Sequence, residues 1–353
     1  MNQLIAPFVV LACLLILPAP VAATVYYVSP TGHSHAAGTA EAPFNSLNEA
    51  AWRAQPGDVI RVAAGVYTQA EPIHLEHKGT AAQPIRVEPA SAERPVFDFS
   101  AQVFTERHNG IDVAGDYWHV VGLEVMGAAH NGIYISGQHN IVERCAIHDN
   151  QDTGLHIGGD AAGYNLVLDC ESYHNLDRPT HGENADGFSA KFKIGPGNVF
   201  RGCRSWENAD DGYDLWRASE PVRIEYCTAC RNGINVWNLP GFTGNGNGFK
   251  LGGDHVPAAH VVIGCTAMDQ PVRGFDENNN TAGLTIEHCT AIRCQTGYAF
   301  TGTPVTGKPH VLRDNISWDA PARLVEGTVS ERNLWFDASG KPQKATIVQP
   351  AQK

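Results

Sequence analysis

Four aspartates and one lysine in the middle of the chain have types and spacings that could build a reactive site. Asp210, Asp211 and Asp214 lie in the segment "DDGYD", and Asp186 lies in "ADGFS". Carboxylates packed together repel and raise one another's pKa unless a cation neutralises them. Oxygen ligands without nearby Cys or His favour a hard cation, Ca²⁺ more than Mg²⁺. The alternative is that these Asp-Gly pairs are turn residues that face water.

A repeated unit decides which of these residues are neighbours in space. The unit is a polar residue, Gly, then apolar-x-apolar, with copies starting at 109, 131, 153, 186, 211, 247 and 296 and a degenerate copy at 273. In a second unit, a cysteine follows 13 to 17 residues after the Gly. The period of 22 to 36 residues predicts an all-β, right-handed parallel β-helix of roughly 8–10 coils, in which equivalent residues stack about 4.8 Å apart. Leucine-rich repeats have a similar period, but their leucine framework is missing.

The register of the first unit gathers charged residues on neighbouring coils. Asp186 and Asp211 each precede a Gly, so they become ladder neighbours, with Asp210 and Asp214 close to them in sequence. The column two residues after each Gly faces outward and reads Tyr134, His156, Ser189, Asp214, Lys250, Asp276 and Ala299. Lys250 is therefore expected between two aspartates at the edge of the cluster. Taken alone, it would be an ordinary solvated lysine.

Aromatic and basic residues near the cluster could bind a sugar acid. The candidates for stacking on sugar rings, each of which could equally be a core residue, are Trp206, Trp216 and Trp237. The candidates for binding a carboxylate, which could equally form surface salt bridges, are Lys191, Lys193, Arg217 and Arg231. Our predicted substrate-binding residues are Arg217, Arg231, Trp216 and Trp237.

Six cysteines share one position of the second unit, and asparagines recur five residues later. The cysteines are Cys145, Cys170, Cys203, Cys227, Cys265 and Cys289. We expect an inward ladder of mostly free, buried thiols, although the spacing would permit some disulfides. The asparagines, for which we expect a structural turn ladder, are Asn150, Asn175, Asn208 and Asn232.

The two ends of the chain have different patterns. Residues 1–23 lack charge and end in small residues, which is typical of a secretory signal peptide. A membrane anchor is the alternative, but Pro18 and Pro20 argue against a continuous spanning helix. Residues 24–353 would then form one β-helix domain. The segment "PFNSLNEAAWRAQ" predicts a helix with Ser46 as N-cap, which we interpret as a cap over the open end. Residues 320–353 are expected to close the other end.

The formal net charge is −12. This charge argues against a nucleic-acid partner. An acidic protein would also repel a polyanion, unless bound cations invert the local field. We expect a secreted or periplasmic monomer that has no membrane contact after signal cleavage.

Three central motifs together resemble the family 9 polysaccharide lyases, which are right-handed parallel β-helix pectate lyases. The motifs are "NADGFSAKF" (184–192), "ENADDGYDLW" (207–216) and "GNGFKLGG" (246–253). The segments "YYVSPTG" and "GFDENNNTAGLTIEHCTA" are also similar, so the resemblance covers nearly the whole mature chain. The resemblance implies that Asp186, Asp210, Asp211 and Asp214 bind Ca²⁺ and that Lys250 is the catalytic base.

The chemistry that this resemblance implies is β-elimination on polygalacturonate. Ca²⁺ would bind the C6 carboxylate, and neutral Lys250 would remove the C5 proton, leaving a 4,5-unsaturated sugar. We expect Ca²⁺ to lower the pKa of Lys250, and Asp214 and Asp276 to raise it.

Three alternatives stay open. They are a lyase acting on rhamnogalacturonan or alginate, a hydrolase that uses paired carboxylates, and a non-catalytic binding module. The ultraviolet absorbance of a new double bond separates a lyase from a hydrolase. A binding module has no reason to keep the lysine and four aspartates in register.

Overall fold

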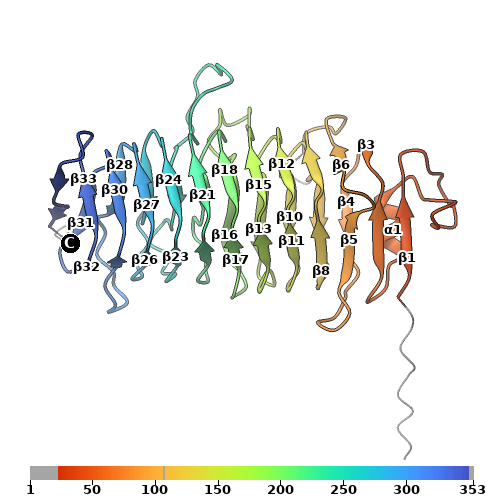
Figure 1. The fold of residues 1–353 in the computed structure, drawn as a ribbon, viewed down its shortest axis with the longest axis horizontal. Helices are drawn as coiled ribbons and strands as arrows, with labels where there is room; N and C mark the ends of the chain where they lie inside the picture. The colour runs from red at the N-terminus through yellow and green to blue at the C-terminus, as the bar shows by residue number, and fades with distance from the viewer. Residues whose placement is uncertain (1–22, 106–107, 350–353) are drawn as a thin grey trace, which may run out of the picture.

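The protein is described by a computed structural model that covers residues 23–105 and 108–349. The chain winds into an elongated solenoid of short strands, with β1 near one end and β32 and β33 near the other (Figure 1). The predicted signal peptide lies, except for Ala23, outside the described residues. Within the described part of the chain, no helix has the length and apolar character needed to cross a membrane.

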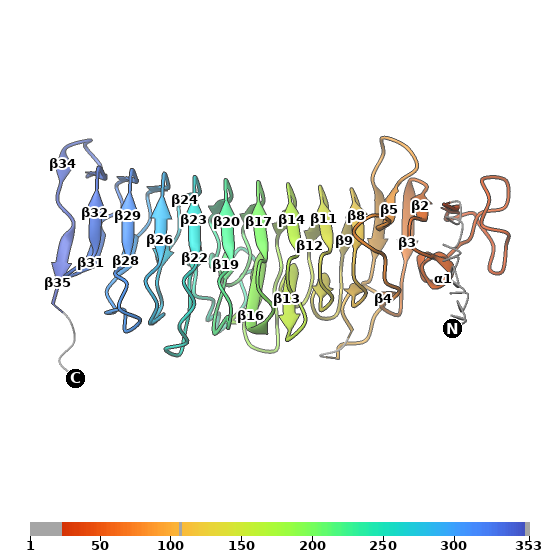
Figure 2. The same ribbon diagram turned by 90° about the horizontal axis from the view of Figure 1, so that it is seen from below.

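Three sheets run along the solenoid, and within each sheet neighbouring strands come from successive coils (Figure 2). Sheet A consists of β1 (Val25–Val28), β2 (Val59–Val62), β5 (Ile85–Pro89), β8 (Trp118–Val121), β11 (Ile141–Glu143), β14 (Leu166–Leu168), β17 (Val199–Arg201), β20 (Arg223–Glu225), β23 (Val261–Ile263), β26 (Thr285–Glu287), β29 (Val311–Arg313) and β32 (Val329–Glu331). Sheet B consists of β3 (Gly65–Thr68), β6 (Pro95–Asp98), β9 (Glu124–Met126), β12 (Ala146–His148), β15 (Glu171–Tyr173), β18 (Arg204–Trp206), β21 (Thr228–Cys230), β24 (Thr266–Met268), β27 (Thr290–Ile292), β30 (Ile316–Trp318), β33 (Leu334–Phe336) and β34 (Pro342–Gln343). Sheet C consists of β4 (Ile73–Leu75), β7 (Ile111–Val113), β10 (Ile133–Ile135), β13 (Leu155–Gly159), β16 (Phe188–Ile194), β19 (Tyr213–Asp214), β22 (Phe249–Lys250), β25 (Arg273–Asp276), β28 (Thr296–Phe300), β31 (Ala322–Val325) and β35 (Thr346–Val348).

The parallel β-helix prediction is confirmed, but the predicted number of coils was too low. The described residues form sheets of 12, 11 and 12 strands, so the solenoid exceeds the predicted 8–10 coils. The extra coils come from both ends, where the repeated Gly and Cys units are missing. Residues after 320, which we expected only to close the end, continue the sheets as β31 to β35; β34 pairs antiparallel with β33.

Ladders of similar side chains stack between successive coils. The aromatic rings of Tyr213, Phe249 and Phe275 stack in the core of sheet C with centroids 4.7 and 4.8 Å apart. The six predicted ladder cysteines are buried and free. The predicted asparagine ladder is also present, since Asn150 Nδ2 donates to Asn175 Oδ1 at 2.9 Å and the pattern continues through the next coils. These ladders fix the position of each sheet C strand.

The predicted helix forms as α1 (Leu47–Arg53). Ser46 is its N-cap, with the Oγ accepting a hydrogen bond from the backbone N of Glu49. Leu47, Ala50 and Ala51 are buried, and the helix packs against β1 and β4. Its role as a cap over the open end stays a prediction.

Candidate active site

Four successive strands of sheet C position the central charged residues. In the paired register, Ser189 of β16 lies beside Asp214 of β19, Asp214 beside Lys250 of β22, and Lys250 beside Asp276 of β25. The predicted outward column is therefore confirmed residue by residue. Phe249 and Leu251, on either side of Lys250, point into the core.

The four predicted metal ligands converge at the start of these strands. One carboxylate oxygen of each of Asp186, Asp210, Asp211 and Asp214 lies within 4.8 Å of the others. All four side chains are buried. The backbone N of Asp211 donates to Asp186 Oδ1 at 3.2 Å, which holds the two ladder neighbours in place. Four buried carboxylates at this separation require positive charge nearby.

Two lysines supply positive charge in the structure. The Nζ of Lys191 lies 2.6 Å from Asp186 Oδ2 and 2.9 Å from Asp214 Oδ2. The Nζ of Lys250 lies 3.0 Å from Asp211 Oδ2 and 3.4 Å from Asp214 Oδ2. The sequence indicated Lys191 as a possible binder of carboxylate, and the structure gives it two aspartate partners within the cluster.

The surroundings shift the pKa of these groups in opposite directions. Burial raises the pKa of Asp186 and Asp211, and the lysine charges offset this only in part. Burial acts on Asp214 in the same way, but the two lysines outweigh it and lower its pKa. Burial lowers the pKa of Lys250, but the carboxylates, Asp211 first, outweigh burial, and the pKa lies well above the ordinary lysine value.

The cluster fits a hard cation. All its side-chain donors are carboxylate oxygens, the ligands that Ca²⁺ prefers. The buried Oδ2 of Asp211 accepts no hydrogen bond from a neutral group in the described structure, and its contact is with the Lys250 ammonium at 3.0 Å. This oxygen keeps its lone pairs for a further ligand. Asp210 Oδ1 accepts from the backbone N of Asn245, so the loop before β22 is tied to the same site.

The expectation that Asp214 raises the pKa of Lys250 is confirmed, whereas Asp276 is not among the main causes of the shift. Asp276 is a register neighbour of Lys250, but its carboxylate turns to the guanidinium of Arg273, three residues earlier. The groups that raise the pKa of Lys250 are the four aspartates of the cluster.

The four predicted substrate-binding residues are placed differently from one another. Trp216 follows β19, and its backbone N donates to Asp214 Oδ1 at 2.8 Å. Arg217 lies with its guanidinium over the Trp216 ring and beside Asp254. Arg231 pairs with Glu207 and lines a separate depression along sheet B. Trp237 packs, with other residues of its loop, on a small apolar cluster away from the solenoid core. Of the four, Trp216 contacts an aspartate of the cluster directly, through its backbone, and Trp237 packs on the small apolar cluster that includes Ala185 and Ala209, the residues before Asp186 and Asp210.

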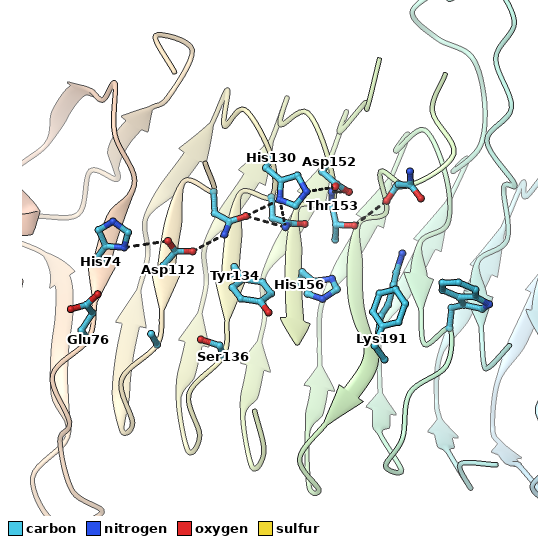
Figure 3. A pocket seen from close by; sticks show the side chains of 16 residues that line it. His74, Glu76, Asp112, His130, Tyr134, Ser136, Asp152, Thr153, His156 and Lys191 are labelled. Atoms are coloured by element: carbon cyan, nitrogen blue, oxygen red, sulfur yellow. Dashed lines mark hydrogen bonds and ion pairs between the residues drawn. The ribbon is translucent and has the colours of Figure 1, made fainter. Parts of the chain in front are cut away.

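A cleft of about 680 Å³ opens over sheet C on the N-terminal side of the aspartates (Figure 3). The side chains that line it include His74, Asp112, Tyr134, His156 and Lys191. Sequence reasoning missed this cleft, although Asp112 follows Gly110 at the same offset as the other members of the outward column, and Asp112 pairs with Tyr134 in register. His74 extends the column on β4, but no Gly unit precedes it.

The fold and the site agree with a known family. A family model described as "Pel9A-like, right handed beta helix region" matches residues 26–315. The chain belongs to this family. The Pel9A-like match spans the sheets, the aspartate cluster and Lys250, and it agrees with the right-handed β-helix that the sequence predicted.

Individual proteins are also similar to this chain in sequence or structure. Pectate lyase L of Dickeya dadantii strain 3937 is 39% identical over 319 residues, which cover 88% of this chain and 75% of that protein. The crystal structure of pectate lyase Pel9A superimposes with a TM-score of 0.83 at 38% identity, covering 89% of this chain and 80% of that one. A rhamnogalacturonan lyase structure matches with a TM-score of 0.74 at 26% identity, covering 93% and 87%. This Pel9A-like chain is a polysaccharide lyase, and its relatives support pectate lyase activity.

Proposed function

We propose that the protein is a calcium-dependent lyase that cleaves α-1,4-galacturonan by β-elimination, with Lys250 as the base. The observation that carries the proposal is the contact of Lys250 Nζ with two aspartates of a buried four-aspartate cluster, 3.0 Å from Asp211 and 3.4 Å from Asp214. A base and a cation site in contact are what proton removal next to a carboxylate needs.

The four aspartates would hold the cation, and Lys250 would act on the substrate. Bound Ca²⁺ supplies charge stabilisation to the uronate carboxylate as the C5 proton leaves. Lys250 Nζ would take that proton, and the electron pair would form the C4–C5 double bond as the C4–O bond breaks, with the departing oxygen taking a proton from water. The product is a 4,5-unsaturated sugar.

The neighbours of Lys250 explain how an amine could serve as a base. Two opposed effects set its pKa in the structure, since burial lowers it and the cluster carboxylates raise it. Neutralising these carboxylates removes the effect that holds the proton and leaves burial, which favours the neutral amine. Lys191 pairs with Asp186 and Asp214, and these carboxylates raise its pKa and keep it an ammonium. The same effect keeps Lys250 protonated when no cation is bound. We therefore expect activity to rise toward alkaline pH and to require Ca²⁺.

A second substrate is supported by one observation. The 26% identical structural neighbour is a rhamnogalacturonan lyase. A backbone that alternates rhamnose and galacturonate still presents a galacturonate carboxylate to the cation and a C5 proton to Lys250. Rhamnogalacturonan is accordingly the second candidate polymer.

The location of the enzyme is also a proposal. We propose that residues 1–23 are removed on export and that residues 24–353 act as one catalytic domain, secreted or in the periplasm. The named pectate lyase relatives support this location, because pectate is a polymer found outside the cytoplasm.

The test is an ultraviolet assay of purified protein on polygalacturonate with Ca²⁺ and with a chelator. A rise in absorbance that needs Ca²⁺ supports the proposal. Reducing ends formed without absorbance would indicate a hydrolase and contradict it.

A further inference from the structure

The cleft beside the aspartate cluster is well placed to hold the sugar next to the reacting one. It runs across β7, β10, β13 and β16 and meets the cluster through Thr153, whose Oγ1 donates to Asp186 Oδ2 at 3.2 Å. Its volume of about 680 Å³ falls in the range of roughly 300–1,000 Å³ that is usual for small-molecule sites. A polymer with one uronate at the cation site would continue into this cleft.

The charges of the cleft are unusual for a site that holds an acidic polymer. Three carboxylates line it, those of Glu76, Asp112 and Asp152. Among its described lining residues there is no arginine, and the one lysine, Lys191, is held by two aspartates of the cluster. The guanidinium of Arg217 lies over the Trp216 ring and does not line the cleft. A uronate carboxylate in the cleft would therefore face three carboxylates, against the single ammonium of Lys191 among the described lining residues.

The histidines of the cleft do not reverse this balance. His74 Nδ1 lies 3.2 Å from Asp112 Oδ2, and His130 Nε2 lies 2.9 Å from Asp152 Oδ2 (Figure 3). Each of these pairs carries zero net charge if the imidazole is protonated and a negative charge if it is neutral. Burial, followed by the charge of Lys191, lowers the pKa of His156 to about 3, so this ring is neutral. Glu76 forms no ion pair within the described part of the chain, so Glu76 and the two His–Asp pairs together carry negative charge in either case.

The remaining lining groups suit hydroxyl-bearing sugars. Asn109 Nδ2 donates to Asp112 Oδ1 at 2.7 Å, and Asn109 Oδ1 contacts both Asn131 and His130, so a hydrogen-bonded row forms one wall. Tyr134 and His156 stack at 5.4 Å and present flat rings beside that row. Neutral donors, acceptors and ring faces bind sugar hydroxyls and the apolar face of a pyranose.

We propose that this cleft binds an uncharged sugar unit of the polymer, next to the galacturonate that is cleaved. The unit would be a galacturonate whose carboxyl is methyl-esterified or a neutral sugar such as rhamnose, which share the absence of charge. The inference rests on the proposed lyase function and specifies its substrate class.

The test compares three polymers in the ultraviolet assay at saturating Ca²⁺: fully de-esterified polygalacturonate, the same polymer partly methyl-esterified, and alternating rhamnose–galacturonate. The expected result is a kcat/KM about tenfold higher on at least one of the last two polymers, the scale of one unfavourable charge contact. The preferred polymer identifies the source of the neutral unit.

Asp152→Asn removes one of the cleft charges and can keep the hydrogen bond from the Thr153 backbone N. We expect Asp152→Asn to lower KM on polygalacturonate and so to narrow the difference in kcat/KM between this polymer and the preferred one. The control is Asp160→Asn, at an exposed carboxylate beside Lys193. It should leave the ratio of kcat/KM between the polymers unchanged. Equal or better cleavage of de-esterified polygalacturonate by the wild type overturns the inference and leaves the lyase function intact. Absence of unsaturated product from all three polymers overturns both.

Discussion

Lys191 and Lys250 contact the same oxygen, Oδ2 of Asp214, at 2.9 and 3.4 Å. Asp214 lies on β19 of sheet C. Lys191 reaches the Asp214 oxygen from the neighbouring strand β16, and Lys250 reaches it from β22 on the other side. Two ammonium groups thus share a cluster of four carboxylates. The arrangement leaves a net negative site into which a divalent cation fits, and it gives the two lysines separable roles.

Lys191 should compete with the cation for the aspartates. Replacing it in Lys191→Met keeps much of the side-chain volume and removes the ammonium from Asp186 and Asp214. We expect Ca²⁺ to bind about tenfold tighter, corresponding to about 1.4 kcal/mol, as measured by isothermal titration calorimetry. Lys193→Met is the matched control, because Lys193 is 80% exposed and lies 3.8 Å from Asp160. Unchanged or weaker binding in Lys191→Met would show that Lys191 supports the cation instead.

Removal of Ca²⁺ should destabilise the protein through the same cluster. A ligand present at about 100 times its Kd stabilises the folded state by about 2.7 kcal/mol. We expect a chelator to lower the Tm of the wild type and to have little effect on Asp211→Asn, which removes one ligand charge. Differential scanning calorimetry with and without the chelator measures both. A wild-type Tm that is indifferent to Ca²⁺ would argue against a cation at these aspartates.

Two buried histidines should make the protein less stable in acid. Burial lowers the pKa of His260 to about 3 and that of His310 to about 4, whereas an unperturbed histidine titrates near 6.5. Below pH 6.5 the unfolded chain takes up protons that the folded chain does not. The free energy of unfolding is thus fully maintained above pH 6.5 and falls as the pH drops toward 4, by about 1.4 kcal/mol per pH unit for each histidine.

His260→Asn tests this contribution. His260 Nδ1 accepts a hydrogen bond from the backbone N of Val222 at 3.0 Å. Asn198 occupies the same position before its sheet A strand and accepts from Asn165 in the same way, so asparagine suits the site. Denaturant unfolding at pH 7.5 and pH 5 should show a smaller loss of stability in the variant than in the wild type. The exposed His33→Asn should behave like the wild type. If His260→Asn lost as much unfolding free energy between pH 7.5 and pH 5 as the wild type, His260 would not be a source of the acid sensitivity.

The sequence predicted the relative positions of the site residues better than it predicted their side-chain contacts. One repeated Gly unit was enough to place Lys250 beside Asp214, because stacking in a parallel β-helix preserves register. The turn of Asp276 toward Arg273 was not predictable, since the register fixes neighbours on adjacent coils and not the choice between partners. Alternation likewise places Lys191 on the outward face, two residues after Ser189, but its double contact with Asp186 and Asp214 is a choice of partners that the register does not fix.

The ends of the solenoid were underestimated for a physical reason. Strands such as β2 (Val59–Val62) and β29 (Val311–Arg313) follow the period-2 burial pattern, but any short β-strand shows that pattern. Only the repeated Gly and Cys positions identify a strand as part of a coil, and they are missing near both ends. The cleft was missed in part because its strand β4 has no repeated Gly unit. Asp112, however, lies two residues after Gly110, so the repeat could have placed it in the outward column.

The assignment of Lys250 as the base is the central claim, and Lys250→Met tests it most directly. The measurement is the rate of ultraviolet-absorbing product from polygalacturonate at saturating Ca²⁺, with Ca²⁺ affinity determined on the same preparation. We predict a loss of roughly 10²–10⁴-fold in kcat, the usual contribution of a general base, with Ca²⁺ binding retained or strengthened. A variant that binds Ca²⁺ and still releases unsaturated product at the wild-type rate would contradict the account.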